Sequence, residues 1–193
     1  MIMNVLFETE RLVLKALDDS GDNCRKVLNF LKKGRDVFEK YEMKKVPLYY
    51  TDMYQRSVLS TEYAATVGNR YIRYYVFLKD DPGTVIGTVS CGNIMQEPYC
   101  SGTIGYKFDE DYWHKGYARE ALKAMVGEVF KELKLHRLIA YVMEHNAPSI
   151  KLLEAVGFRM EGLCEKNLIV NGVWENHMLY AMLNPDEEHY GRG

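Results

Sequence analysis

The strongest constraint on the fold is a long amphipathic helix pattern that lies between two strand patterns. Apolar residues recur at helical spacing on one face of this segment, at Ala118, Ala121, Leu122, Met125, Val126, Val129, Phe130 and Leu133. Strands are expected before it at 101–109 and after it at 137–143, and the second is almost continuously apolar, which indicates burial on both faces. A helix that connects two strands of one sheet makes a crossover, so these two strands are expected to run parallel.

The rest of the chain predicts further strands and helices around this unit. Alternating and β-rich patterns predict strands at 11–17, 71–79, 84–94, 159–170 and 174–183, and helical patterns cover 23–41, 51–67 and 146–156. Asn171-Gly172 is a strong signal for a type I′ turn between the last two strands. We see no repeat or linker, so residues 1–193 are expected to form a single domain with a mixed sheet, and 184–193 are expected to fray as a polar tail.

Composition and charge exclude several classes of function. The net charge of −2 gives no basic field that would attract nucleic acid. No apolar run approaches the roughly 20 residues of a membrane span, and the first ten residues lack the basic start of a signal peptide, so a cytoplasmic protein that binds no membrane is expected. The cysteines Cys24, Cys91, Cys100 and Cys164 form no C-x-x-C pair, so we expect reduced, packed thiols and no metal.

The start of the central helix is a candidate anion site. Gly116 lets the backbone approach a phosphate, Ala118 keeps that side clear, and Lys115 and Arg119 add positive charge. The free N–H groups and the dipole of a helix start favour an anion, so a pyrophosphate would fit. The sequence is neither a P-loop, since no Gly-Lys-Ser/Thr follows, nor a G-x-G-x-x-G dinucleotide motif.

Several ordered motifs together resemble the GNAT acetyltransferase superfamily, in particular the branch that contains the ribosomal-protein N-terminal (alanine/serine) acetyltransferases and the spermidine acetyltransferases. These motifs are Trp113-His114-Lys115-Gly116-Tyr117-Ala118-x-Glu120-Ala121, Asn146-x-x-Ser149, Gly157-Phe158-x-x-Glu161-Gly162, Asn171-Gly172-x-Trp174 and Thr9-Glu10-Arg11-Leu12. The resemblance runs from about residue 7 to 183, while residues 23–70 carry no motif of the family. It implies an α+β fold with a mostly antiparallel twisted sheet, a splayed central parallel pair and helices on both faces.

The resemblance also implies roles for individual residues, with acetyl-CoA as co-substrate. The strand end that contains Tyr106, Lys107 and Phe108 would splay from the strand at 137–143 and pair with the pantetheine arm. Asn146 and Ser149 would contact the same arm, and the N–H of Phe108 would polarise the thioester carbonyl. The pyrophosphate would bind the helix start, formed by His114, Lys115, Gly116, Tyr117, Ala118 and Arg119.

The sequence departs from the family at positions that matter for catalysis. His114 stands where glycine is common, Leu153 where many relatives have a tyrosine that protonates the thiolate, and Leu168 near a glutamate proposed as base in some relatives. Ser149 is therefore a candidate acid, with a hydroxyl that only bonds the helix backbone as the alternative. Asn146 is likewise either a cofactor ligand or only a helix cap.

The acceptor site has several candidates and no decisive one. Glu165, Glu175 and the run 109–111 could receive a cationic acceptor, or they could be solvated charges. His177 is interpreted as a packed histidine, and His114 is poorly placed to act as a base. The cluster Tyr49, Tyr50 and Tyr54 could line the acceptor groove or pack a surface helix.

The function predicted from the sequence is acetyl transfer from acetyl-CoA to a primary amine, most simply a protein N-terminus such as that of a ribosomal protein. An α-amino group has a pKa of roughly 7.7–8.0 against about 10.4 for a lysine, so it demands less of a base. Polyamines, aminoglycosides and other small amines stay open as acceptors. A non-catalytic acyl-CoA sensor and a nucleotide-binding α/β domain are the other classes, and the chain is expected to be a monomer or a homodimer.

Overall fold

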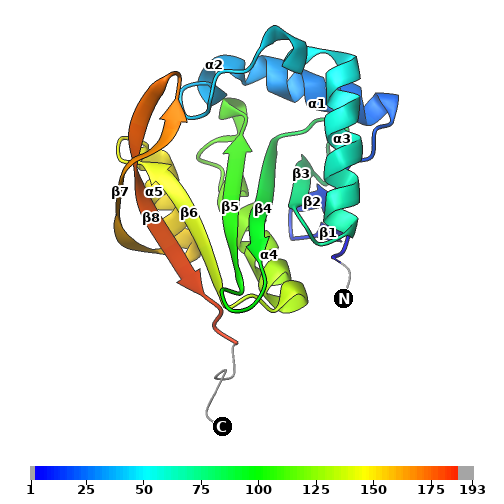
Figure 1. Ribbon diagram of the computed structural model, residues 1–193. Coiled ribbons are helices and arrows are strands. Elements are labelled where there is room, and N and C mark those ends of the chain that lie inside the picture. The colour runs from blue at the N-terminus through cyan, green and yellow to red at the C-terminus, as the bar shows by residue number, and fades with distance from the viewer. Residues whose placement is uncertain (1–2, 187–193) are drawn as a thin grey trace.

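The structure, a computed structural model, describes residues 3–186, and its strands form one mixed sheet of eight (Figure 1). The spatial order is β1-β2-β3-β4-β5-β6-β8-β7. Every neighbouring pair is antiparallel except β5 and β6. The strands are β1 (Leu6–Glu8), β2 (Leu12–Lys15), β3 (Ile72–Leu78), β4 (Gly87–Met95), β5 (Ser101–Phe108), β6 (Arg137–Met143), β7 (Arg159–Val170) and β8 (Val173–Leu183).

Helices cover both faces of the sheet, which confirms the three-layer expectation. In β3, Tyr74 packs with the core cluster of α4 and α5, whereas Tyr75 packs with the cluster of α1 and α3. Successive side chains of a strand point to opposite faces, so each cluster belongs to one face. The helices are α1 (Gly21–Lys33), α2 (Arg35–Phe38), α3 (Asp52–Val67), α4 (Tyr117–Leu133) and α5 (Ala147–Val156), with 3₁₀ turns η1 (Pro47–Tyr50) and η2 (Glu110–Tyr112). None of the helices in the described part of the chain is long and apolar enough to span a membrane.

The parallel pair at the centre of the sheet separates along its length, as predicted. Residues 101–103 of β5 pair with residues 137–139 of β6, and the pairing ends there although both strands continue. On the other side of β5, Gly87 lies opposite Phe108, and the N–H of Asp109 donates to the carbonyl of Ile86 (3.0 Å). This antiparallel pattern turns the backbone groups of Phe108 and Tyr106 away from β4 and toward the gap.

Local signals placed the elements around this gap correctly. Gly116 caps α4 in the left-handed region with φ +82°. Asn146 caps α5, with Pro148 in the first turn, and the helix ends at Gly157 with φ +116°. Asn171 and the glycine after it both have positive φ, as the type I′ hairpin turn requires.

Three boundary predictions were wrong. The strand β1 was missed, since three residues give too short a pattern to detect. The helix expected over 23–41 breaks at Gly34, a position where a side chain would not fit, since the ring of Phe38 lies 2.3 Å from where its Cβ would be. The tail was expected to fray from 184, yet Asn184 donates to the carbonyls of His136 and Leu135 (2.9 and 3.1 Å). Residues 187–193 of that expected tail lie outside the described residues.

Candidate active site

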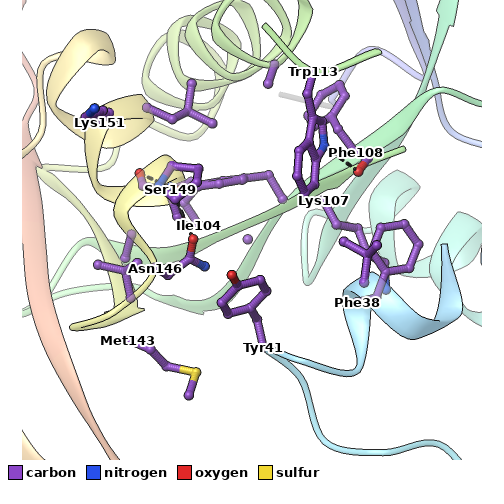
Figure 2. A pocket seen from close by; sticks show the side chains of 18 of the residues that line it. Phe38, Tyr41, Ile104, Lys107, Phe108, Trp113, Met143, Asn146, Ser149 and Lys151 are labelled. Atoms are coloured by element: carbon purple, nitrogen blue, oxygen red, sulfur yellow. Dashed lines mark hydrogen bonds between the residues drawn. The ribbon is translucent and has the colours of Figure 1, made fainter. Parts of the chain in front are cut away.

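The gap between β5 and β6 opens into a cavity of about 500 Å³ (Figure 2). Its walls come from segments far apart in the sequence: the α2 region, the splayed ends of β5 and β6, the loop into α4, and the start of α5. One end lies at the start of α4 and the other at Phe38 and Tyr41 from the α2 region. A cavity that spans the sheet in this way can hold two reactants that meet in the middle.

The α4 end has the geometry of an anion site. His114 and Gly116 both adopt left-handed backbone conformations (φ +59° and +82°), which turn the loop so that the first helical N–H groups are exposed. His114, Gly116, Ala118 and Arg119, four of the residues expected at the pyrophosphate, line the cavity. Lys151 of α5 adds a second positive side chain to the lining. The N–H groups and these two cations favour a bound pyrophosphate.

Two predicted ligands do not face the cavity. Lys115 donates from Nζ to the carbonyl of Asp111 (2.8 Å), so its side chain folds back onto the loop. Tyr117 packs under the guanidinium of Arg11, 4.6 Å from its ring centre. Neither residue is among those that line the cavity, so their part in the motif is to shape the loop.

The loop before α4 is braced by the first strands. Arg11 donates from Nε to Glu120 (2.7 Å) and from Nη1 to the carbonyl of Lys115 (3.0 Å). Thr9 donates from Oγ1 to the same carboxylate (2.6 Å). Burial alone would raise the pKa of Glu120, but the hydrogen bonds from Thr9 and Arg11 outweigh it and lower the pKa. Thr9 and Arg11 therefore hold the anion loop in place, through Glu120 and the carbonyl of Lys115, from 104 or more residues away in the sequence.

A hydroxyl pair lies in the middle of the cavity. The hydroxyl oxygen of Tyr106 lies 2.6 Å from Oγ of Ser149 and 3.2 Å from the Ser149 carbonyl oxygen, and its single hydrogen can be donated to either. Burial raises the pKa of Tyr106 to about 12, although the bond with Ser149 opposes this shift. The backbone N–H of Ser149 donates to Oδ1 of Asn146 (3.2 Å), so Asn146 caps α5 and also lines the cavity.

Phe108 and Trp113 form the wall beside this pair. Nε1 of Trp113 donates to the carbonyl of Phe108 (2.9 Å), and Figure 2 shows the indole over that strand end. The carbonyl is thereby engaged, while the N–H of Phe108 is turned toward the gap. Phe108 therefore has the orientation that an oxyanion donor needs.

The opposite wall comes from the region in which the sequence showed no family motif. Val37, Phe38, Tyr41 and Glu42 line the cavity there, and the Tyr41 hydroxyl points into it (Figure 2). Glu42 accepts from Lys107, whose Nζ lies 3.0 Å from Oε1 and 3.1 Å from Oε2. Burial lowers the pKa of Lys107 although Glu42 pulls in the other direction.

The other acceptor candidates lie outside the cavity. Tyr49, Tyr50 and Tyr54 pack on one another, with ring centres 5.2 and 5.5 Å apart for the two pairs that Tyr49 makes. Burial raises the pKa of Tyr49 to about 12, which fits a packing role. Asp109 is buried and bonds Nζ of Lys33 (2.7 Å), so its charge is already compensated. Among the residues described, neither Glu165 nor Glu175 lines the cavity.

Comparisons with known proteins agree with this geometry. Residues 11–159 match the family model described as "Acetyltransferase (GNAT) domain". The chain belongs to the GNAT acetyltransferase family. It is 38% identical over 161 residues to the probable N-acetyltransferase YjcK of Bacillus subtilis, which covers 83% of this chain and 88% of that one. It is 30% identical over 113 residues to the ribosomal protein uS5-alanine N-acetyltransferase of Escherichia coli, or 58% of each chain.

Solved structures of GNAT acetyltransferases superpose on this chain over most of its length. The ribosomal-protein-S5-alanine acetyltransferase of Vibrio fischeri gives a TM-score of 0.89 at 30% identity and covers 96% of this chain and all of that one (100%). Mycobacterium smegmatis RimJ, solved in complex with a CoA disulfide, gives 0.82 at 26% identity and covers 89% and 81%.

The departures of this GNAT acetyltransferase from its family have physical reasons. Leu153 is fully buried in the core between α5 and the sheet, where a hydroxyl would need a partner. Leu168 is exposed on β7 and does not line the cavity. His114 occupies a left-handed position, which explains why glycine is common there. Burial raises the pKa of Cys91 to about 12 and of Cys24 to about 11, so these thiols are unreactive.

Sequence reasoning missed several polar groups of the site. The Tyr106 hydroxyl was not singled out, because Tyr106 was counted only as part of a backbone ladder. His177 is buried, in agreement with a packed histidine, but it also lines the cavity, which was not predicted. Tyr41 and Glu42 lie in the region without family motifs. No local signal could have found them, because only the folded sheet brings them to β5. Within the described residues, no group of three or more His, Cys, Asp and Glu side chains could hold a metal ion.

Proposed function

We propose that this protein transfers the acetyl group of acetyl-CoA to a protein N-terminal α-amino group, within a ternary complex. The observation that carries the proposal is the cavity that joins the anion site at α4 to a separate wall at α2 through the splayed strands. One reactant can enter from each end without displacing the other. Direct transfer then needs no acyl-enzyme.

The residues at the α4 end fit coenzyme A. The left-handed Gly116 and the free N–H groups of α4 would hold the pyrophosphate, with Arg119 and Lys151 as counter-charges. The pantetheine arm would pair with the backbone of Tyr106 and Phe108 where β6 has separated from β5. Its thioester would then lie beside the N–H of Phe108, which stabilises negative charge on the carbonyl oxygen as the amine attacks.

The departing thiolate has a proton source in this arrangement. Ser149 would donate its proton to sulfur and be resupplied by Tyr106, 2.6 Å away. The start of α5 also favours negative charge near Ser149. A free thiol has an ordinary pKa of about 8.5, so the thiolate needs only modest help at neutral pH.

The acceptor wall favours an amine that carries few other charges. Among the cavity-lining residues of the described chain, Glu42 is the one carboxylate, and Lys107 already neutralises it. A polyamine with several ammonium groups would find no matching acidic wall. A polypeptide N-terminus brings a single amino group, which suits a wall with one, already paired, carboxylate. Relatives named as ribosomal-protein alanine acetyltransferases support the same acceptor class.

A turnover screen tests the proposal. CoA release is followed with peptides that begin in Ala, Ser or Met, with polyamines and with an aminoglycoside. We expect turnover with one or more of the peptides, and the product should carry the acetyl group on its N-terminus by mass spectrometry. If the enzyme prefers a polyamine or an aminoglycoside, the proposed acceptor class is wrong. Tight acetyl-CoA binding without turnover of any amine would indicate a sensor domain instead.

A further inference from the structure

We propose that Nε2 of His177, on β8, is the base that deprotonates the attacking amine. The inference rests on the acetyl transfer proposed above and adds a catalytic residue to it. The reaction needs such a group, because an amine is largely protonated near neutral pH and only the neutral form attacks a thioester.

His177 lies on the acceptor face of the sheet. On β8, Met178 and Tyr180 pack into the core cluster of α4 and α5. Side chains alternate along a strand, so His177 points to the other face, toward the side that carries α1, α2 and α3. It is 4% exposed and yet lines the cavity, beside Met143 of β6 and Cys164 of β7 in the strand register.

The ring is held in an orientation that suits a base. Nδ1 of His177 lies 3.1 Å from the carbonyl oxygen of Glu175. A carbonyl can only accept a hydrogen bond, so Nδ1 carries the hydrogen and the neutral ring has its lone pair on Nε2. Within residues 3–186, every fully buried side-chain nitrogen or oxygen has a hydrogen-bond partner. This agrees with an Nε2 atom that is not fully buried but reaches the open cavity.

The rival bases are less suitable. Both carboxylate oxygens of Glu42 contact the ammonium of Lys107, and Lys45 lies 3.9 Å from one of them. Its lone pairs are therefore engaged in an ion pair. The family position for a glutamate is near Leu168, which carries no titratable group. A histidine is the side chain whose ordinary pKa, about 6.5, suits deprotonation near neutral pH.

Titratable groups near His177 lie on several elements. Cys164 lies next to it on β7, and Glu144 follows β6, where its carboxylate accepts from Asn176. Tyr41 and the Glu42–Lys107 pair line the same cavity. These groups stay unchanged in the test below, so a change in the pH profile can be traced to position 177.

The proton and bond changes balance without any other reactant. Nε2 takes one proton from the acceptor ammonium and passes it to solvent. The neutral amine then forms the C–N bond to the acetyl carbon while the C–S bond breaks, with the electron pair on sulfur. The nitrogen sheds its second proton to solvent as the amide forms, and the thiolate gains one from Ser149, which is resupplied from solvent through Tyr106, so one proton is released overall. The products are the acetylated amine and the CoA thiol.

The test compares His177→Gln with Glu175→Gln, a control on the same strand that keeps the carbonyl bonded to Nδ1. We expect His177→Gln to lower kcat about 10²–10⁴-fold, to leave the acetyl-CoA Kd unchanged, and to lose the acidic limb of the pH–rate profile. The control should match the wild type. Because position 177 is buried, His177→Ala is measured as well, and added imidazole should restore part of its rate.

Two further measurements separate this role from packing and from the proposed acceptor. An acceptor such as hydroxylamine, which is neutral at pH 7, should show a much smaller loss in His177→Gln. If the wild type acetylates no amine of the screen, the proposed function fails, and acceptor-free hydrolysis of acetyl-CoA then tests the base, since His177→Gln should slow it. A His177→Gln enzyme with the wild-type rate and pH profile overturns the proposal, as does an equal loss with hydroxylamine.

Discussion

Substituting Gly116 tests the anion site most directly. Gly116 has φ +82° and ψ −2°, and a Cβ added there would lie 3.3 Å from Nη2 of Arg11. A residue with a side chain pays about 1–2 kcal/mol in the left-handed region. In Gly116→Ala the free loop can relax this strain, whereas the loop that holds a pyrophosphate cannot, so coenzyme A binding should weaken about 5–30-fold, at about 1.4 kcal/mol for each factor of ten.

A charge at the same position should have a larger effect. The carboxylate of Gly116→Glu would lie roughly 5 Å from a pyrophosphate oxygen, which at an effective dielectric constant of about 20 costs about 3 kcal/mol. Added to the backbone strain, this predicts a loss of affinity of about a thousandfold or more. Isothermal titration calorimetry with coenzyme A measures both variants.

Gly127→Ala is the matched control, since Gly127 lies in the same helix and an added Cβ meets nothing within 4 Å. It should leave the affinity unchanged and raise stability by about 1 kcal/mol, because alanine favours a helix over glycine. Thermal melts of all three variants separate unfolding from loss of binding. Equal affinity of Gly116→Glu and the wild type would refute the placement of the pyrophosphate.

Three further predictions concern the surroundings of this site. Arg119→Ala should weaken coenzyme A binding about tenfold, whereas Lys115→Ala should change it less than about twofold, because Arg119 lines the cavity and Lys115 does not. Equal losses of affinity in calorimetry would contradict this. Ser149→Ala and Tyr106→Phe should each lower kcat by a factor near the low end of the 10²–10⁴-fold range for general acids, with little change in acetyl-CoA affinity. If kcat is unchanged under conditions where chemistry limits the rate, water is the proton donor to the thiolate. Because the pKa of Glu120 is lowered, its ion pair with Arg11 contributes stability that is complete above about pH 4.3, the ordinary pKa, and is lost as pH falls through the folded value. The Tm difference between wild type and Glu120→Gln should therefore shrink on acidification. A constant difference from pH 7 to 3 would contradict a stabilising role of this ion pair.

The amino-acid sequence by itself determined the features that depend on near neighbours. The buried face of α4 could be predicted because its apolar residues recur every helical turn. The cap Asn146 and the turn at Asn171 could be predicted because their interactions act within three residues. The anion loop was readable for the same reason. Where distant contacts decide, the predictions failed, as at Asn184, which was expected to fray but donates to the carbonyls of Leu135 and His136.

Only the tertiary structure decided which polar groups meet inside the cavity. Tyr106 bonds Ser149 from 43 residues away, and Lys107 bonds Glu42 from 65 residues away. His177 reaches the cavity because β8 lies beside β6 and turns that side chain to the α2 face. These contacts follow from the order of strands in the sheet and from the point where β5 and β6 separate. That order reflects the burial of both sheet faces at once, a property of the whole chain that no short stretch of sequence records.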